Sequence, residues 1–155
     1  MKIRLLLSCL ALLLAVAPAR AADEKHSDKH AEKHTELGDK MEKINAAWRK
    51  LRRQVADPAK NADSLALLAE IRAASAGTEK LTPDKASDLP EADRAKFQAD
   101  YAAGMKKFAG MLDDLEAALK AGKNDDAGKI VSAIADFQRE SHKAFRRPPP
   151  EKPKA

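Results

Sequence analysis

Two side chains of this chain, Met41 and His142, could together bind a transition metal. A thioether sulfur and an imidazole nitrogen on opposite sides of a flat cavity are the pair that ligates haem iron in electron-transfer cytochromes, where the sulfur favours the ferrous state. With both axial positions filled by protein, iron has no vacancy for oxygen or substrate. Each residue also has an ordinary structural role, because methionine often fills a core and a cation near a helix C-terminus is favoured by the helix dipole. Taken singly, each residue is more often found in this structural role than as a metal ligand.

Four segments that would position these residues have apolar residues at intervals of three and four, the pattern of amphipathic helices. The first carries one stripe of six residues: Leu37, Met41, Ile44, Trp48, Leu51 and Val55. The second is shorter and carries Leu65, Leu68 and Ile71 or Arg72. The third carries Phe97, Tyr101, Gly104, Phe108, Met111, Leu115 and Ala118. The fourth carries Ile130, Val131, Ile134, Phe137, Gln138, Ser141, His142 and Phe145.

The residues between the segments are those that end and begin helices. Asp57 and Pro58 end the first segment, Gly77 and Gly122 follow the second and third, and residues 77–90 form a longer loop in which Pro90 suits the first turn of the next helix. Expected N-caps are Asn61 or Asp63 for the second helix and Asn124 for the fourth, and Arg146 and Arg147 place cations at the end of the fourth.

No strand pattern occurs, so we expect an all-α fold, an antiparallel up-down-up-down four-helix bundle. In such a bundle the start of the first helix and the end of the fourth meet. Met41 and His142, each about one turn from those ends, should then face each other at one level.

Short sequences along the chain resemble successive segments of the cytochrome b562 family. They are residues 38–45 (Gly-Asp-Lys-Met-Glu-Lys-Ile-Asn), 71–74 (Ile-Arg-Ala-Ala), 82–83 (Thr-Pro), Gly104 with 110–114 (Gly-Met-Leu-Asp-Asp), 122–123 (Gly-Lys) and 142–146 (His-Lys-Ala-Phe-Arg). They occur in order and at compatible spacing across residues 37–147. The resemblance implies one non-covalent haem b per chain, with Met41 and His142 as axial ligands of the iron.

The resemblance also implies a lining for the haem pocket: Leu37, Ile44, Pro83, Tyr101, Met105 and Ile134, with Arg146 near the haem edge. For the apolar members, ordinary core packing is an equal alternative. Gln138 lies one turn before His142, where this family often has arginine, so that arginine is absent here and Arg139 or Arg146 would have to interact with the haem propionates in its place. The chain lacks a Cys-x-x-Cys-His sequence before His142, which excludes the covalent attachment found in cytochrome c prime.

The two ends of the chain differ from the helical region. Residues 1–21 combine a basic start, a short apolar run and small residues at Ala19 and Ala21, so we expect a signal peptide and a periplasmic protein with no stable membrane anchor. The only cysteine, Cys9, lies in that peptide. Residues 22–36 form a polar, His- and Lys-rich tail and residues 148–155 a Pro-rich tail, leaving 37–147 as the four-helix haem domain.

The net charge and its distribution along the chain argue against nucleic acid as a partner. Removal of Lys2, Arg4 and Arg20 with the signal peptide leaves 26 basic and 24 acidic residues, a net charge of +2. The charges are mixed and aromatic residues are few, so nucleic acid is not an expected partner. We expect a monomer that exchanges electrons with unidentified periplasmic redox partners.

Three alternatives remain open. His26, His30 and His34 recur every fourth residue and could chelate Zn²⁺ or Cu²⁺, but a solvated tail is favoured because lysines precede them. A haem-free bundle serving as a periplasmic binding or stress module would be expected to lose Met41 or His142, and both are present. A metal-carboxylate enzyme needs inward Glu and Glu-x-x-His pairs, which the stripes lack. No hydrolytic triad or phosphate loop is visible either, so the sequence does not predict an enzyme.

Overall fold

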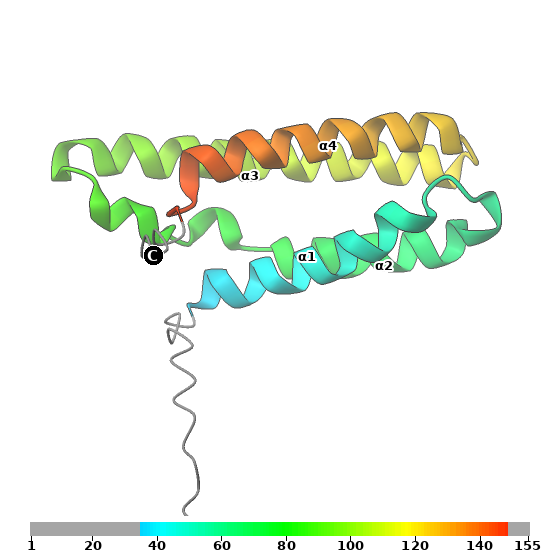
Figure 1. Cartoon of the computed structure of the whole chain (residues 1–155), viewed down its shortest axis with the longest axis horizontal. Coiled ribbons are helices and arrows are strands. Elements are labelled where there is room, and N and C mark those ends of the chain that lie inside the picture. The colour runs from blue at the N-terminus through cyan, green and yellow to red at the C-terminus, as the bar shows by residue number, and fades with distance from the viewer. Residues whose placement is uncertain (1–34, 149–155) are drawn as a thin grey trace, which may run out of the picture. The chain divides into compact units, whose positions relative to one another are not determined.

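The computed structural model describes residues 35–148, which contain four α-helices and no strand (Figure 1). The helices are α1 (Glu36–Gln54), α2 (Asn61–Ser75), α3 (Glu91–Lys120) and α4 (Asn124–Phe145). Three short 3-10 segments connect them: η1 (Pro58–Lys60), η2 (Thr78–Lys80) and η3 (Asp84–Asp88). The all-α, four-helix prediction is therefore confirmed.

The chain divides into two units, residues 1–32 and 33–155, and all the described helices belong to the second. The expected signal peptide, the three tail histidines and residues 149–155 lie outside the described residues. Thr35 and Glu36, which the sequence pattern assigns to the tail, begin the bundle. The Thr35 hydroxyl accepts a hydrogen bond of 3.1 Å from the Gly38 amide and so caps α1.

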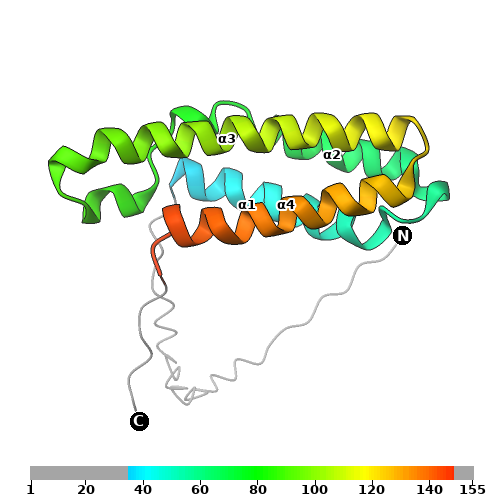
Figure 2. The same cartoon turned by 90° about the horizontal axis from the view of Figure 1, so that it is seen from above.

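Hydrogen bonds and ring contacts at the two ends of the bundle establish the direction of each helix. At one end the Asn124 amide, at the start of α4, donates to the carbonyl of Val55, which follows α1, and pairs with Asn61 at the start of α2. At the other end Phe145, the last residue of α4, packs against Phe97 and Tyr101 near the start of α3. Consecutive helices therefore run in opposite directions, as Figures 1 and 2 show.

The predicted stripes supply most of the core, with four additions. The main cluster of buried side chains consists of Ile44, Ala47, Trp48, Leu51, Val55, Leu68, Ile71, Leu112, Leu115, Ala118, Leu119, Ala127, Val131 and Ile134. Leu112 and Leu119 lie outside the stripe expected for α3. They are buried because this long helix packs against both α2 and α4, so its apolar face is wider than one stripe. Ala47 and Ala127 were also missed, because alanine gives only a weak periodic signal.

The expected N-caps of α2 and α4 are wrong. Neither helix has a side-chain cap, and Asn61 and Asn124 instead bond to each other and across the loops. Asn124 donates to the Val55 carbonyl at 2.8 Å, and Asn61 donates to the Leu119 carbonyl at 3.4 Å. Asp63 is exposed and lies 3.7 Å from the Lys60 ammonium. The two asparagines therefore satisfy backbone groups that close the bundle at this end.

Replacing Asn124 by alanine should lower the free energy of unfolding by about 1–3 kcal/mol, because the buried Val55 carbonyl and Asn61 amide lose their partner. Urea denaturation of the variant measures the change. Ser132→Ala is a control on the same helix, since this serine is exposed and should change stability by no more than about 0.5 kcal/mol. Equal stability of Asn124→Ala and the parent protein would show that the network contributes nothing net.

The glycine and proline residues predict the connections between the helices only in part. Gly77 and Gly122 have φ angles of 77° and 68°, the left-handed region in which glycine is favoured, and each lies just beyond a helix as expected. Pro90 precedes α3 as its N-cap and is not in the first turn. The predicted loop of residues 77–90 contains η2 and η3, which place Pro83 and Ala86 in buried positions.

Candidate functional site

Met41 and His142 lie at the same end of the bundle. Met41 is in the second turn of α1, where it is half-buried and packs against the core cluster. His142 is in the last turn of α4 and is exposed. Figure 2 shows the start of α1 and the end of α4 at this common end, opposite the loop that joins α3 to α4.

The helices that carry these two residues are not closely packed on each other. The backbones of α1 and α2 approach each other closely, as do those of α2 and α3 and those of α3 and α4, whereas α1 and α4 do not form such a pair. Leu51, Leu115 and Leu119, three of the fully enclosed side chains, lie toward the opposite end, whereas Thr78 is enclosed at this one. A flat prosthetic group between α1 and α4 would therefore not have to separate a closely packed pair of helices.

The chemistry of the donor set also fits haem better than a bare metal ion. Among residues 35–148, no three His, Cys, Asp or Glu side chains gather into a group that could hold a metal ion. A structural zinc ion requires four protein ligands and a catalytic one three, whereas haem brings its own four nitrogens and needs only axial ligands from the protein. One sulfur and one imidazole are sufficient for that purpose.

The environment of His142 favours the form that binds metal. Partial burial and the neighbouring Arg146 guanidinium lower the pKa of the imidazole below its ordinary value. The ring is therefore neutral at pH 7, and a nitrogen lone pair is available to a metal. Within residues 35–148 no hydrogen bond holds the ring, so there its orientation depends on the backbone of the last turn of α4.

The other residues that the resemblance assigns to the haem pocket fall into three groups. Ile44, Pro83, Tyr101 and Ile134 are buried, Leu37 and Met105 are half-buried, and Arg146 is exposed. Ile44 and Ile134 belong to the core cluster together with the residues that contact Met41. Met105 instead lines a cavity of about 310 Å³ with residues of α2, including Arg72 and Ser75. Neither Met41 nor His142 lines that cavity, so the structure does not bring Met105 to them.

Tyr101 connects the start of α3 to the His142 turn. Its ring packs edge-on against Phe145, with the ring centres 5.5 Å apart. Burial raises the pKa of Tyr101 to about 12, although the nearby Thr78 hydroxyl opposes this change. The Tyr101 hydroxyl is buried and has no hydrogen-bond partner of normal geometry among the described residues. It therefore stays protonated at neutral pH and remains available as a donor.

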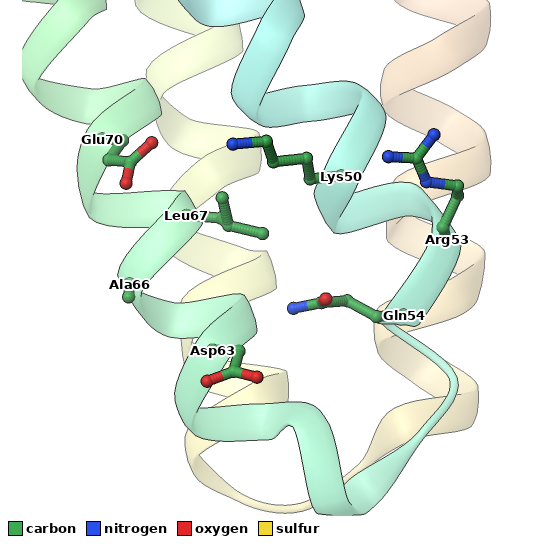
Figure 3. Close-up of a pocket in the computed structure, with 7 residues that line it drawn as sticks. All are labelled: Lys50, Arg53, Gln54, Asp63, Ala66, Leu67 and Glu70. Atoms are coloured by element: carbon green, nitrogen blue, oxygen red, sulfur yellow. The ribbon is translucent and has the colours of Figure 1, made fainter.

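A second hollow, on the surface between α1 and α2, does not include any predicted site residue (Figure 3). It has a volume of about 480 Å³ and is lined by Lys50, Arg53, Gln54, Asp63, Ala66, Leu67 and Glu70. Most of these side chains are exposed and charged. The hollow is a solvated groove, and the candidate site remains at the contact between α1 and α4.

Comparison with protein-family models bears on the kind of group that the site could hold. A family model described as Cytochrome b562 matches residues 36–146, which is most of the chain. The chain belongs to the cytochrome b562 family. This match confirms the resemblance inferred from the short sequences and agrees with the four-helix fold. Members of the cytochrome b562 family are haem-binding electron-transfer proteins, which is the chemistry that a Met and His donor pair suits.

Two further observations complete the comparison. None of the curated proteins compared with the chain matches it. In the part of the chain that the structure describes, no helix is long and apolar enough to cross a membrane.

Proposed function

We propose that this member of the cytochrome b562 family is a periplasmic electron carrier that binds one non-covalent haem b, with Met41 and His142 as axial ligands. The observation that carries the proposal is the position of these two residues. They lie at the same end of the bundle, on the pair of neighbouring helices that is not closely packed. The family match supports haem as the group between them.

The chain's own residues would set the properties of the site. Bound haem supplies a centre that takes up and releases one electron. The Met41 sulfur favours the reduced state, and the neutral His142 imidazole is the stronger ligand. Ile44 and Ile134 keep water from the inner side of the site, which also affects the potential. Arg146 is exposed beside His142 and is the cation available to the haem propionates in place of the arginine absent at Gln138.

The location and partners are part of the proposal. Export with cleavage near Ala21 would remove Cys9 and leave a mature chain without cysteine, so haem cannot be held by thioether bonds. The mature protein would be a monomer without a membrane anchor that exchanges electrons with periplasmic redox proteins. It would not be an enzyme, because two protein ligands leave the iron no position for a substrate.

Titration of the apo-protein with haem should quench the fluorescence of Trp48 to an endpoint at one haem per chain. Trp48 is the only tryptophan and is buried seven residues after Met41, about 10 Å along the helix axis, so energy transfer to haem is efficient. Acid and organic solvent should then extract all the haem. Quenching without an endpoint at one equivalent would contradict a specific site. Haem that stays on the denatured chain would contradict non-covalent binding.

A further inference from the structure

The last turn of α4, which carries His142, is held by the η3 segment. The Lys85 ammonium donates hydrogen bonds to the carbonyls of Lys143 at 3.0 Å and Ala144 at 2.7 Å. Carbonyls in the last turn of a helix have no partner within the helix, and a cation there also interacts favourably with the helix dipole. Lys85 therefore caps α4 from a segment almost 60 residues earlier in the chain.

Arg147, two residues after the end of α4, makes a second connection, in which the side chain comes from the α4 end and binds η3. Its Nε and terminal nitrogen donate to the two carboxylate oxygens of Asp88 at 2.8 and 2.7 Å, and the terminal nitrogen also reaches the Ser87 hydroxyl and the Asp84 carbonyl. Two parallel bonds between a guanidinium and a carboxylate fix orientation as well as distance. Arg147 also lowers the pKa of Asp88, so the pair is ionised at neutral pH.

These contacts act locally. The side chains of Arg147 and Asp88 are 51% and 49% exposed, and exposed ion pairs contribute little to global stability. Their effect is to hold a helix end, which is the part of a helix that most readily opens. The sequence pattern suggested only a favourable dipole interaction for Arg147, and this residue lies just beyond the part of the chain that the family model matches.

His142 depends on this support more than most histidine ligands. A ligating histidine ordinarily donates its second ring N–H to a protein group that fixes the ring. No such partner of His142 is present among the described residues, so the ring's position follows that of the backbone. That backbone is fixed by Lys85, Arg147 and the packing of Phe145 against Phe97, whose ring centres are 5.3 Å apart.

We propose that Lys85, Asp88 and Arg147 are positioning residues for His142: by holding the last turn of α4 against η3, they keep the imidazole at the haem iron. This inference rests on the proposed haem function. It gives the loop between α2 and α3 a role at the site in addition to the burial of Pro83 and Ala86.

The test measures haem loss from the full-length holo-protein to excess apomyoglobin, together with the high-spin fraction in the ferric absorption spectrum. Arg147→Ala should release haem about three to ten times faster than the parent protein and should show more high-spin iron. Arg147→Lys keeps the positive charge but cannot form the two parallel hydrogen bonds of the guanidinium, so its rate of haem loss should lie between those of Arg147→Ala and the parent protein. Lys129→Ala is the matched control. It removes one cation from an exposed ion pair with Asp126 at the other end of α4, and it should behave like the parent.

Three results would overturn the inference. The first is an unchanged rate and spectrum in Arg147→Ala, and the second is an equal change in Lys129→Ala. In the third, Arg147→Ala lowers the melting temperatures of the apo and holo forms by the same amount and leaves the spin state unchanged. The contacts would then be merely structural. Amide hydrogen exchange of the apo-protein separates this inference from the proposed function. Faster exchange of residues 143–146 in Arg147→Ala would support the hold on α4 even if the parent protein bound no haem, and unchanged exchange would contradict it.

Discussion

Replacing His142 by alanine is expected to remove most of the haem affinity, and replacing Met41 by alanine to leave haem bound with an open iron position. The difference arises because imidazole is the stronger ligand, whereas the thioether contributes less to binding and more to the preference for ferrous iron. In Met41→Ala the ferric iron should shift toward high spin and the ferrous form should bind carbon monoxide. Haem titration and absorption spectra with and without carbon monoxide measure both effects.

Lys60→Ala provides the control for these variants, since Lys60 is exposed in η1 at the opposite end of the bundle. It should bind haem like the parent and remain unreactive to carbon monoxide. If the parent protein itself binds carbon monoxide readily, the iron does not have two protein ligands. If His142→Ala binds haem as tightly as the parent, the histidine is a helix-end cation and not a ligand.

Haem should stabilise the protein by about 3–4 kcal/mol when free haem is a hundred to a thousand times its dissociation constant, because it binds the native state alone. The structure gives a reason to expect this dependence. Met41 is half-buried and His142 is exposed, so haem held between them would cover side chains that the protein alone leaves open to solvent. The apo-protein should keep most of its helix and melt at a clearly lower temperature than the holo-protein.

Calorimetry of apo and holo forms, with circular dichroism of the apo form, measures this stabilisation. The difference in melting temperature should shrink sharply in Met41→Ala and largely vanish in His142→Ala. Equal melting temperatures with and without haem in the parent protein would mean that Met41 is a core residue and His142 a helix-end cation. The bundle would then correspond to the haem-free binding or stress module.

The helices could be predicted because burial in a bundle repeats along each helix. The stripe from Leu37 to Val55 needed only the spacing of its apolar residues, and the structure confirms its buried part. Met41 and His142 could be placed at one end by the same reasoning, since helix length and direction determine which residues meet. The position of these two candidate residues could therefore be predicted from the sequence, whereas their interpretation as haem ligands came from the family resemblance and stays a prediction.

Contacts between distant polar residues could not be predicted in the same way. Asn61 and Asn124 look like N-caps because local preference favours asparagine at that position, but each finds partners on another element. Arg147 and Asp88 are 59 residues apart, and nothing in the local sequence of either indicates the other. Such pairs depend on how η3 lies against α4, and that is a property of the folded chain alone.

The absorption spectrum of the purified protein, oxidised and then reduced with dithionite, tests the haem assignment most directly. The account predicts a low-spin b-type spectrum in both states, with one haem per chain and no change on adding carbon monoxide to the reduced protein. Ligation by Met41 and His142 would be contradicted if the reconstituted protein showed no haem spectrum. It would also be contradicted if the spectrum of the reduced protein changed at once when carbon monoxide was added.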